Sequence, residues 1–350
     1  MSHLTTSSAL GARPALARAP VLATRRLSAA SWLAIAFFAG ALLFGAVALA
    51  MGDVFYLRLA TEALIFGGLA LSVDLLLGRV GLLPLGQALF FGLGAYVSAL
   101  VLKHWADSLW LALSVALVFS ALAGLIGGLI AIRSKGVYFA LISFGLAQVV
   151  SKFVYNTREL GASDGIIGVP AASLAPGVTS GTPEVFFLLV LAFIGALYLG
   201  LRYLMNTPMG RQLDAIRINE HRVSFLGVDA WRYKLGAFVA AACIAGLSGA
   251  LYPMLRGFVS PELMFFQVSG NAVINVIVGG TGTLIGPLYG SAILTGLRSV
   301  VGSFTAHHHI VIGVMFVVVV IVMPRGLIGY TTPLLQRWLD RRQAPAKERP

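Results

Sequence analysis

Residues 109–132 read LWLALSVALVFSALAGLIGGLIAI, a run without a single charged side chain. An α-helix needs about 20 consecutive apolar residues to cross the hydrocarbon layer of a membrane, so this run is long enough to span it. Similar blocks fill most of the 350 residues: 58% of the chain is hydrophobic, 11% is charged, and the mean hydropathy is +0.90. A soluble protein carries roughly twice that charged fraction. The sequence therefore predicts an all-α polytopic membrane protein.

Nine further apolar blocks lie on either side of this run. The ten predicted transmembrane helices are 31–51, 57–77, 83–102, 109–132, 137–155, 184–205, 234–255, 268–279, 288–304 and 310–323. Two of them, 268–279 and 310–323, are short for a membrane span. Another, 83–102, opens with Pro84 and Gly86. We therefore expect some of these helices to be broken or re-entrant.

Basic residues predict how the helices are oriented, because short cytoplasmic loops hold an excess of Lys and Arg. With the amino terminus in the cytoplasm, 19 of the 25 basic residues fall inside. The six outside are Arg58, Lys103, Lys152, Arg158, Arg256 and Arg298. This predicts cytoplasmic termini, with a disordered basic tail at 1–30, a transmembrane domain at 31–329 and a second basic tail at 330–350. A cleaved transit peptide is the alternative for the first tail.

The net charge of +12 raises the question of nucleic acid. The charged residues lie between the apolar blocks and do not form one basic face, so membrane topology explains them and no nucleic-acid partner is expected.

Ten helices divide into two blocks of five, which is the arithmetic of an inverted repeat. Each half contains a glycine-rich segment with a proline: GLLPLGQALFFGLGAYVSAL at 81–100 and VGGTGTLIGPLYGSAIL at 278–294. Interrupted segments in matching places point to a transport pathway. The alternative is that these glycines only let helices approach closely, as GLIGG at 124–128 and GPLYG at 286–290 would in any helix bundle.

One polar stretch, TPMGRQLDAIRINEHRVSFLGVDAWRYK at 207–234, interrupts the apolar sequence. Its apolar residues recur at helical spacing; they are Met209, Leu213, Ile216, Val223 and Leu226. Charged residues lie between them, namely Arg211, Arg217, Glu220 and Arg222. Pro208 suits a first helical turn and Gly227 a helix end. The pattern predicts one short amphipathic helix on a cytoplasmic loop, with a plain interfacial helix as the alternative to a coupling role.

Four stretches together resemble the M-type membrane subunit of branched-chain amino acid ABC transporter permeases. They are GLLPLGQALFFGLGAYVSAL at 81–100, SKGVYFALISFGLAQ at 134–148, GRQLDAIRINEHRVSFLGVDAWRYKLGAFVAAACIAGLSGALY at 210–252, and GFVSPELMFF followed by VGGTGTLIGP at 257–287. The resemblance extends over about residues 55–329. Each stretch alone is weakly specific, but their order and spacing are specific together.

The resemblance implies a permease subunit of an ATP-driven, binding-protein-dependent importer in the bacterial inner membrane. The implied partners are two ATPase subunits, a second permease subunit, an extracytoplasmic solute-binding protein and the lipid bilayer. An ATPase would dock on the cytoplasmic loop at 206–233, whose residues matching the family pattern are Pro208, Gly210, Arg211, Ala215, Ile216, Arg217, Glu220 and Gly227. The apolar face of the loop helix would fill a groove on that ATPase, and Arg211→Glu or Glu220→Lys would uncouple transport.

No G-x-x-x-x-G-K-[ST] sequence is present, so ATP and magnesium are expected on the partner subunits and no cofactor on this chain. No HExxH motif occurs, and GASDG at 161–165 matches GxSxG only within a predicted outer loop and not in a strand–turn–helix elbow, so no enzymatic activity is expected. The three histidines at 307–309 lack an acidic or cysteine partner and are interpreted as a polar cap, so no metal site is predicted.

An outer loop reads LGASDGI at 160–166, where the family has T-G-G-x-N/D-G-I. By resemblance its Gly161, Asp164 and Gly165 are candidates for docking the binding protein. Ala162 replaces the second glycine, which changes the turn if that position needs a positive φ.

Polar residues inside apolar spans are the candidates for lining a solute path; they are Gln87, Tyr96, Tyr138, Ser143, Gln148, Asn271 and Asn275. Helix-to-helix hydrogen bonds would satisfy such groups equally well. Among the acids, Asp74 is expected to pair with Arg79, and Glu62 lies near the outer end where it can reach water. Acids within a span also leave open a stand-alone, ion-gradient-driven carrier or channel. The solute is not determined by the sequence: relatives move branched-chain amino acids, urea or amides.

Overall fold

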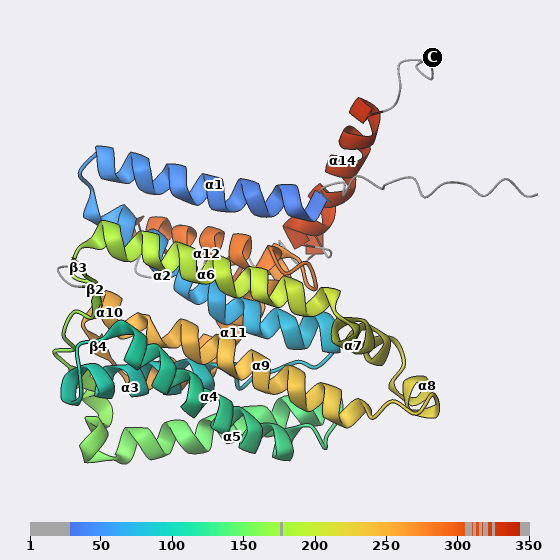
Figure 1. Ribbon diagram of the computed structural model, residues 1–350, viewed down its shortest axis with the longest axis horizontal. Helices are drawn as coiled ribbons and strands as arrows, with labels where there is room; N and C mark the ends of the chain where they lie inside the picture. The colour runs from blue at the N-terminus through green and yellow to red at the C-terminus, as the bar shows by residue number, and fades with distance from the viewer. Residues whose placement is uncertain are drawn as a thin grey trace, which may run out of the picture.

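The computed structural model describes residues 29–175 and 178–304, positions 310, 313–314, 317 and 321–323, and the segment 326–343. Its long helices pack side by side with their axes roughly parallel (Figure 1). Six stretches of this part of the chain are long and apolar enough to cross a membrane: Ala29–Ala50, Val54–Val80, Leu109–Ala131, Val137–Asn156, Pro183–Asn206 and Ala230–Arg256. The all-α polytopic prediction is confirmed at that level. The number ten remains a prediction, since 310–323 lies mostly outside the described residues.

The helices follow the predicted blocks closely. The first half contains α1 (Ala29–Ala50), α2 (Val54–Asp74), the π-helix η1 (Leu75–Val80), α3 (Gln87–His104), α4 (Leu109–Ala131) and α5 (Val137–Asn156). The second half contains α6 (Pro183–Asn206), α7 (Pro208–Ile218), α8 (Glu220–Phe225), α9 (Ala230–Ala250), α10 (Tyr252–Arg256), α11 (Phe266–Gly279), α12 (Gly286–Phe304) and α14 (Gly326–Gln343). The predicted boundary at 329 therefore falls inside α14.

Local sequence explains where several helices begin. Asp53 caps α2 by accepting a hydrogen bond from the amide of Phe55 at 3.0 Å, and Asp229 caps α9 by accepting from Trp231 at 3.2 Å. Such caps satisfy amides that have no partner within the helix. Pro183 occupies the first turn of α6, where its missing amide hydrogen costs nothing.

The two interrupted segments predicted from sequence are irregular in the structure. Residues 81–86 have no regular helix between η1 and α3, and residues 280–285 form turns between α11 and α12. The glycines beside them pack closely, as the alternative interpretation expected: a Cβ on Gly94 would collide with the carbonyl oxygen of Gly246, and one on Gly290 with that of Asn275. Helices α3 and α9, and α11 and α12, can meet only because these residues have no side chain.

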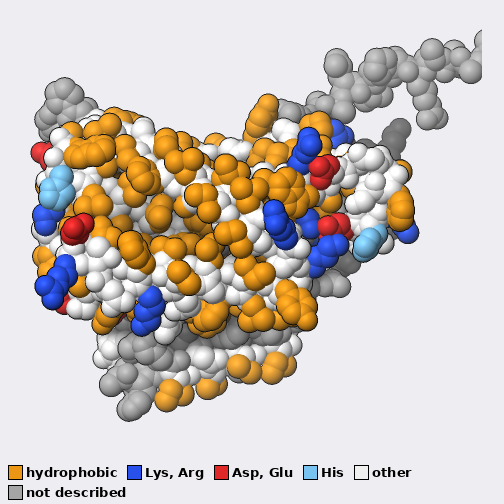
Figure 2. Space-filling model, turned by 90° about the horizontal axis from the view of Figure 1, so that it is seen from below, with side chains coloured by type: hydrophobic (Ala, Val, Ile, Leu, Met, Phe, Trp, Pro, Cys, Tyr) orange, Lys and Arg blue, Asp and Glu red, His pale blue; other side chains and the backbone are white. Residues whose placement is uncertain are grey.

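The bundle has two different ends. At one end lie α7 and α8, which we call the α8 end; α14 and the start of α1 lie on the same side (Figure 1). At the opposite end, the β4 end, short strands pair antiparallel: β1 (Ile166–Ile167) with β4 (Phe258–Val259), and β2 (Ser173–Ala175) with β3 (Val178–Thr179). Figure 2 shows charged side chains gathered at both ends and an apolar surface between them. This distribution suits a bundle whose middle lies in lipid.

Candidate functional site

The polar segment 208–227 forms two helices and not the single helix that we predicted. Helix α7 ends at Ile218, Asn219 adopts an extended conformation, and α8 then begins at Glu220. The Asn219 side chain accepts a hydrogen bond from the amide of Arg222 at 3.0 Å, which caps α8. An asparagine offers the backbone this alternative to a continuous helix. Pro208 lies in the first turn of α7 and Gly227, with φ of 81°, ends the segment, both as predicted.

The apolar face of this segment is turned into the protein. Leu213, Ile216 and Val223 are buried, the last two in a small cluster with Ala230 of α9. The prediction that this face fills a groove on another protein is therefore wrong, because burial within the chain uses it first. Leu226 does not share this buried face, although the helical spacing predicted that it would, since it is 77% exposed.

A different set of apolar side chains is exposed at the α8 end. Ile218 is 84% exposed and Phe225 is 90% exposed, and they join Leu226 in projecting from the loop. We call Ile218, Phe225 and Leu226 the α8 patch. Large apolar groups at such exposure on a polar segment are typical of a surface that another protein covers. The sequence carries a weak signal for Ile218 and Phe225, since they interrupt the charged side of the helical pattern, whereas Leu226 was assigned to its apolar side.

Glu220 ties three segments together. Its Oε1 accepts a hydrogen bond from Lys234 Nζ of α9 at 2.8 Å, and its Oε2 lies 3.5 Å from Lys135 Nζ in the α4–α5 loop. Lys234 is only 4% exposed, so this is a largely buried ion pair. Burial on its own would raise the pKa of the Glu220 carboxyl, but the hydrogen bond and charge of Lys234, joined by Lys135, outweigh it and lower the pKa.

Helix α7 is held against the π-helix at the end of α2. Arg217 donates a hydrogen bond from Nη1 to the carbonyl oxygen of Gly78, and Arg79 forms an ion pair with Asp214 at 3.4 Å. In a π-helix the regular hydrogen-bond pattern is shifted, which leaves carbonyl groups for outside partners. The two arginines therefore connect the α7–α8 segment to the π-helix at the end of α2. One of them, Arg217, reaches from α7 to η1, and the other, Arg79, reaches from η1 to α7.

Asp74 is not paired with Arg79, which corrects the sequence-based expectation. Its carboxylate accepts hydrogen bonds from two backbone amides of the loop between α11 and α12, from Gly282 at 2.5 Å and from Leu284 at 3.0 Å. Arg79 turns to Asp214 instead. Asp74 is fully buried, and the two amides supply the partners that a buried carboxylate needs. One side chain thus fastens an irregular loop to the base of α2.

The remaining residues matched to the family loop divide by exposure. Gly210 and Ile216 are buried, Ala215 is half-buried, and Pro208, Arg211 and Gly227 are exposed. A Cβ at Gly210 would collide with the backbone of Met205, so this glycine lets α7 fold back against α6.

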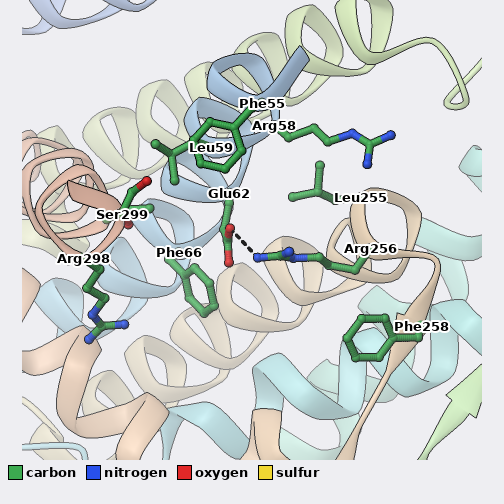
Figure 3. A pocket seen from close by; sticks show the side chains of 11 residues that line it. Phe55, Arg58, Leu59, Glu62, Phe66, Leu255, Arg256, Phe258, Arg298 and Ser299 are labelled. Carbon is green, nitrogen blue, oxygen red and sulfur yellow. Dashed lines mark hydrogen bonds and ion pairs between the residues drawn. The ribbon is translucent and has the colours of Figure 1, made fainter. Parts of the chain in front are cut away.

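A cavity of about 530 Å³ opens at the β4 end. We call it the arginine cavity, because Arg58, Arg256 and Arg298 line it together with Glu62. Arg256 Nη2 of α10 donates to Glu62 Oε2 of α2 at 2.7 Å. Figure 3 shows the Glu62 carboxylate between Arg256 on one side and Arg298 of α12 on the other. Glu62 therefore lies in a cavity that water can reach, as expected, but in an ion pair that the sequence did not indicate.

The seven predicted path residues do not share one cavity. Asn271 and Asn275 of α11 line a space of about 80 Å³ that shares Phe66, Thr295 and Arg298 with the arginine cavity. Gln87 and Ser143 face one another in a region with no room for water, where the Ser143 hydroxyl accepts from the amide of Leu85 at 3.3 Å.

The other three path candidates lie elsewhere. Tyr96 is buried in α3, Gln148 is half-buried on α5, and Tyr138 is 74% exposed on the outside of α5.

The outer loop at 160–166 packs onto the strands of the β4 end. Gly161 and Gly165 have positive φ angles of 86° and 74°, and a Cβ on Gly165 would collide with the carbonyl oxygen of Val259. Ala162 also has a positive φ, 48°. Alanine therefore accepts the left-handed conformation there, and Asp164 remains exposed beside it.

Metal ligands are not gathered anywhere in the described parts of the chain, where no group of three or more His, Cys, Asp or Glu side chains could hold an ion. The histidines at 307–309 lie outside the described residues.

Comparison with known proteins places this architecture. Residues 55–320 match the family described as branched-chain amino acid transport system, permease component. The high-affinity branched-chain amino acid transport permease proteins LivM of Salmonella typhimurium and of Escherichia coli are each 29% identical to the chain over 301 residues. That alignment covers 79% of this chain and 71% of theirs. The ribose import permease RbsC of Haemophilus influenzae is 23% identical over 55% of this chain and 60% of its own. No solved structure matches the chain.

Proposed function

The chain belongs to the family of branched-chain amino acid transport permease components and is a permease subunit of an ABC importer, and we propose that it moves a branched-chain or related amino acid across the bacterial inner membrane. ATP and magnesium would be held by two separate ATPase subunits, a second permease subunit would complete the pathway, and a solute-binding protein would deliver the solute from outside. Six membrane-length helices and the match to LivM support this proposal. Ten transmembrane helices as a 5+5 inverted repeat, with both termini in the cytoplasm, belong to the same proposal.

We place the α8 end in the cytoplasm, because the predicted basic loops gather there. The observation that carries the coupling proposal is the α8 patch. It projects from a segment that is attached to two transmembrane helices and to one loop. Ion pairs and hydrogen bonds of Glu220, Arg217 and Asp214 join the segment to α9, η1 and the α4–α5 loop. A movement imposed on the patch would therefore reach α2 and α9 directly.

The matched residues then have two kinds of role. Gly210, Ala215, Ile216, Arg217 and Glu220 shape the segment and attach it to this chain, and Pro208 and Gly227 set its ends. Arg211 is exposed on α7 and remains a candidate for contact with the ATPase. Arg211→Glu is thus a clean test of uncoupling, whereas Glu220→Lys would first disturb the permease itself.

At the β4 end, the loop with Gly161, Asp164 and Gly165 is proposed to dock the binding protein. Asn271 and Asn275 are the predicted path residues that a cavity supports. Gln87, Ser143, Tyr96, Gln148 and Tyr138 stay candidates without such support.

The test is Phe225→Ser in the complex assembled with its co-encoded ATPases, second permease and binding protein. Removing a largely exposed aromatic anchor should lower ATPase co-purification and ATP-dependent leucine uptake by about tenfold or more. Trp105→Ser is the matched control, since Trp105 is also a largely exposed aromatic, at 72%, and lies at the other end of the bundle; it should leave co-purification unchanged.

Two results would count against the proposal. Equal co-purification of Phe225→Ser and wild type would separate the α8 patch from the ATPase. Leucine uptake by this chain alone in liposomes, without nucleotide, would select the ion-gradient carrier instead.

A further inference from the structure

The arginine cavity has the size and chemistry of a ligand site. Its volume of about 530 Å³ falls within the range of roughly 300–1,000 Å³ typical of small-molecule pockets. Three arginines and a single glutamate line it, so the lining carries a formal excess of positive charge. Its lining includes Arg256 of α10 and Phe258 of β4, so the cavity lies at the β4 end, opposite the segment proposed to meet the ATPases.

Within the described parts of the chain, Arg298 has a hydrogen-bond donor without a partner. It projects from α12, and its Nε is buried with no hydrogen-bond partner among the described residues. Within that part of the chain Arg298 forms no ion pair, and the glutamate of the same cavity, Glu62, is paired with Arg256. The Arg298 side chain is half-buried, so a donor left without a partner there is costly, and a planar carboxylate is the ligand that satisfies the fork of guanidinium donors.

The other walls complete a site for a zwitterion. Glu62 presents a carboxylate within the same cavity, which can face an ammonium group while Oε2 keeps its bond to Arg256. Apolar side chains fill the space between the charges; they are Phe55, Leu59, Phe66 and Leu255. A free α-amino acid with an apolar side chain carries these three features together.

The site also leads inward. Phe66, Thr295 and Arg298 line both the arginine cavity and the smaller space beside Asn271 and Asn275. A ligand bound by Arg298 would therefore sit at the junction between the opening and the amides predicted to line a path.

We propose that the arginine cavity is an outer receiving site for a zwitterionic amino acid, in which Arg298 binds the carboxylate and Glu62 faces the ammonium group. The proposal rests on the proposed function, since it concerns the solute of the same importer. It adds a binding site on the permease itself to the selectivity expected of the binding protein.

The first experiment labels the cavity in membranes containing the full chain. In a Cys243→Ala background, Ser299→Cys places the one thiol on the cavity lining, and Asn156→Cys places it on the exposed end of α5 as a control. Relative to the control, an anionic methanethiosulfonate should react several-fold faster than a cationic one at Ser299→Cys. Adding Arg298→Gln should remove that preference. Equal relative rates in both backgrounds would overturn the charge assignment.

The second experiment uses the assembled transporter and L-leucine as the probe. L-Leucine should protect Ser299→Cys from labelling, whereas L-leucinamide, which has no carboxylate, should not. Arg298→Gln should raise the KM for uptake by about 10- to 100-fold, the loss expected for a charge-assisted hydrogen bond. Lys152→Gln, on the exposed face of α5, is the control.

The outcomes separate the two proposals. If the wild-type complex takes up leucine with ATP but Arg298→Gln has an unchanged KM, or if leucinamide protects as well as leucine, the receiving site is wrong and the function stands. If the wild-type complex shows no ATP-dependent uptake, the proposed function fails, while the charge preference of labelling still reports on the cavity.

Discussion

The two ends of the bundle are built in opposite ways. At the α8 end, Asp74, Arg79, Arg217 and Glu220 each have a partner elsewhere in the chain, and the loop between α11 and α12 is fastened to α2. At the β4 end, three arginines surround a cavity and only Arg256 has an acidic partner among the described residues.

The contrast shows how one chain can combine a rigid end with an end that is able to bind a ligand. Charges that are paired inside the protein hold elements in place and transmit movement, and charges that lack partners are available to a ligand. The α8 end, where the charges are paired, is also the end proposed to meet the ATPases, and a firm connection to the helices is needed there. The predictions that follow test this division, beginning with the largest effect.

Asp74→Ala should destabilise the α8 end more than the other substitutions. It removes the acceptor of two backbone amides and leaves both without that partner, the one of Leu284 in a buried position and the one of Gly282 in a partly buried one. We expect the free energy of unfolding in detergent to fall by about 3–5 kcal/mol, measured by denaturant titration. Asp74→Asn, which keeps one acceptor oxygen, should lose roughly half of that. Equal stability of Asp74→Ala and wild type would mean that the loop is not held by this carboxylate.

Glu220→Gln should lower the free energy of unfolding by about 2 kcal/mol, because it leaves the Lys234 ammonium group largely buried without a counter-charge. The pH dependence gives the sign. The pKa of Glu220 is lowered in the folded protein, so its contribution is fully present above the ordinary glutamate pKa and is lost as the pH falls through the lower, folded value. Wild type should therefore lose stability below about pH 4.5, and Glu220→Gln should lose less over the same range. Parallel curves for the two proteins would contradict the assignment.

Ala162→Gly should have the smallest effect and the opposite sign. Alanine at a φ of 48° occupies the left-handed region, which costs an L-residue about 1–2 kcal/mol. Glycine removes that cost but loses more entropy on folding, so a net gain of about 1 kcal/mol is expected in thermal unfolding. Ala171→Gly, at an exposed loop position without a positive φ, is the control and should not stabilise.

Much of the fold follows from local sequence. The apolar blocks at 109–132, 137–155 and 184–205 are matched within two residues by α4, α5 and α6, because about 20 apolar residues suffice to define a span wherever it lies in the chain. Pro208 and Gly227 likewise mark the ends of the α7–α8 segment, since each acts through its own backbone. The break at Asn219 was missed, because the side-chain cap competes with a helical pattern that continues across it.

The candidate sites depended on contacts that no local pattern carries. Helical spacing showed that Leu213, Ile216 and Val223 share a face, but not whether that face meets another protein or this one. Asp74 has Arg79 nearby in sequence, yet its partners lie more than 200 residues away in the loop at 280–285.

The sequence by itself determined that this chain crosses a membrane, roughly where its helices run, and which family it resembles. Those properties come from the length of apolar runs and from short ordered motifs. Only the tertiary structure decided which charges are paired, because ion pairing depends on distances of a few ångströms between residues that the chain separates widely. Glu62 and Arg256 meet, and Arg298 lines the same cavity with no acidic partner in the described parts of the chain, because α2, α10 and α12 pack together at one end of the bundle.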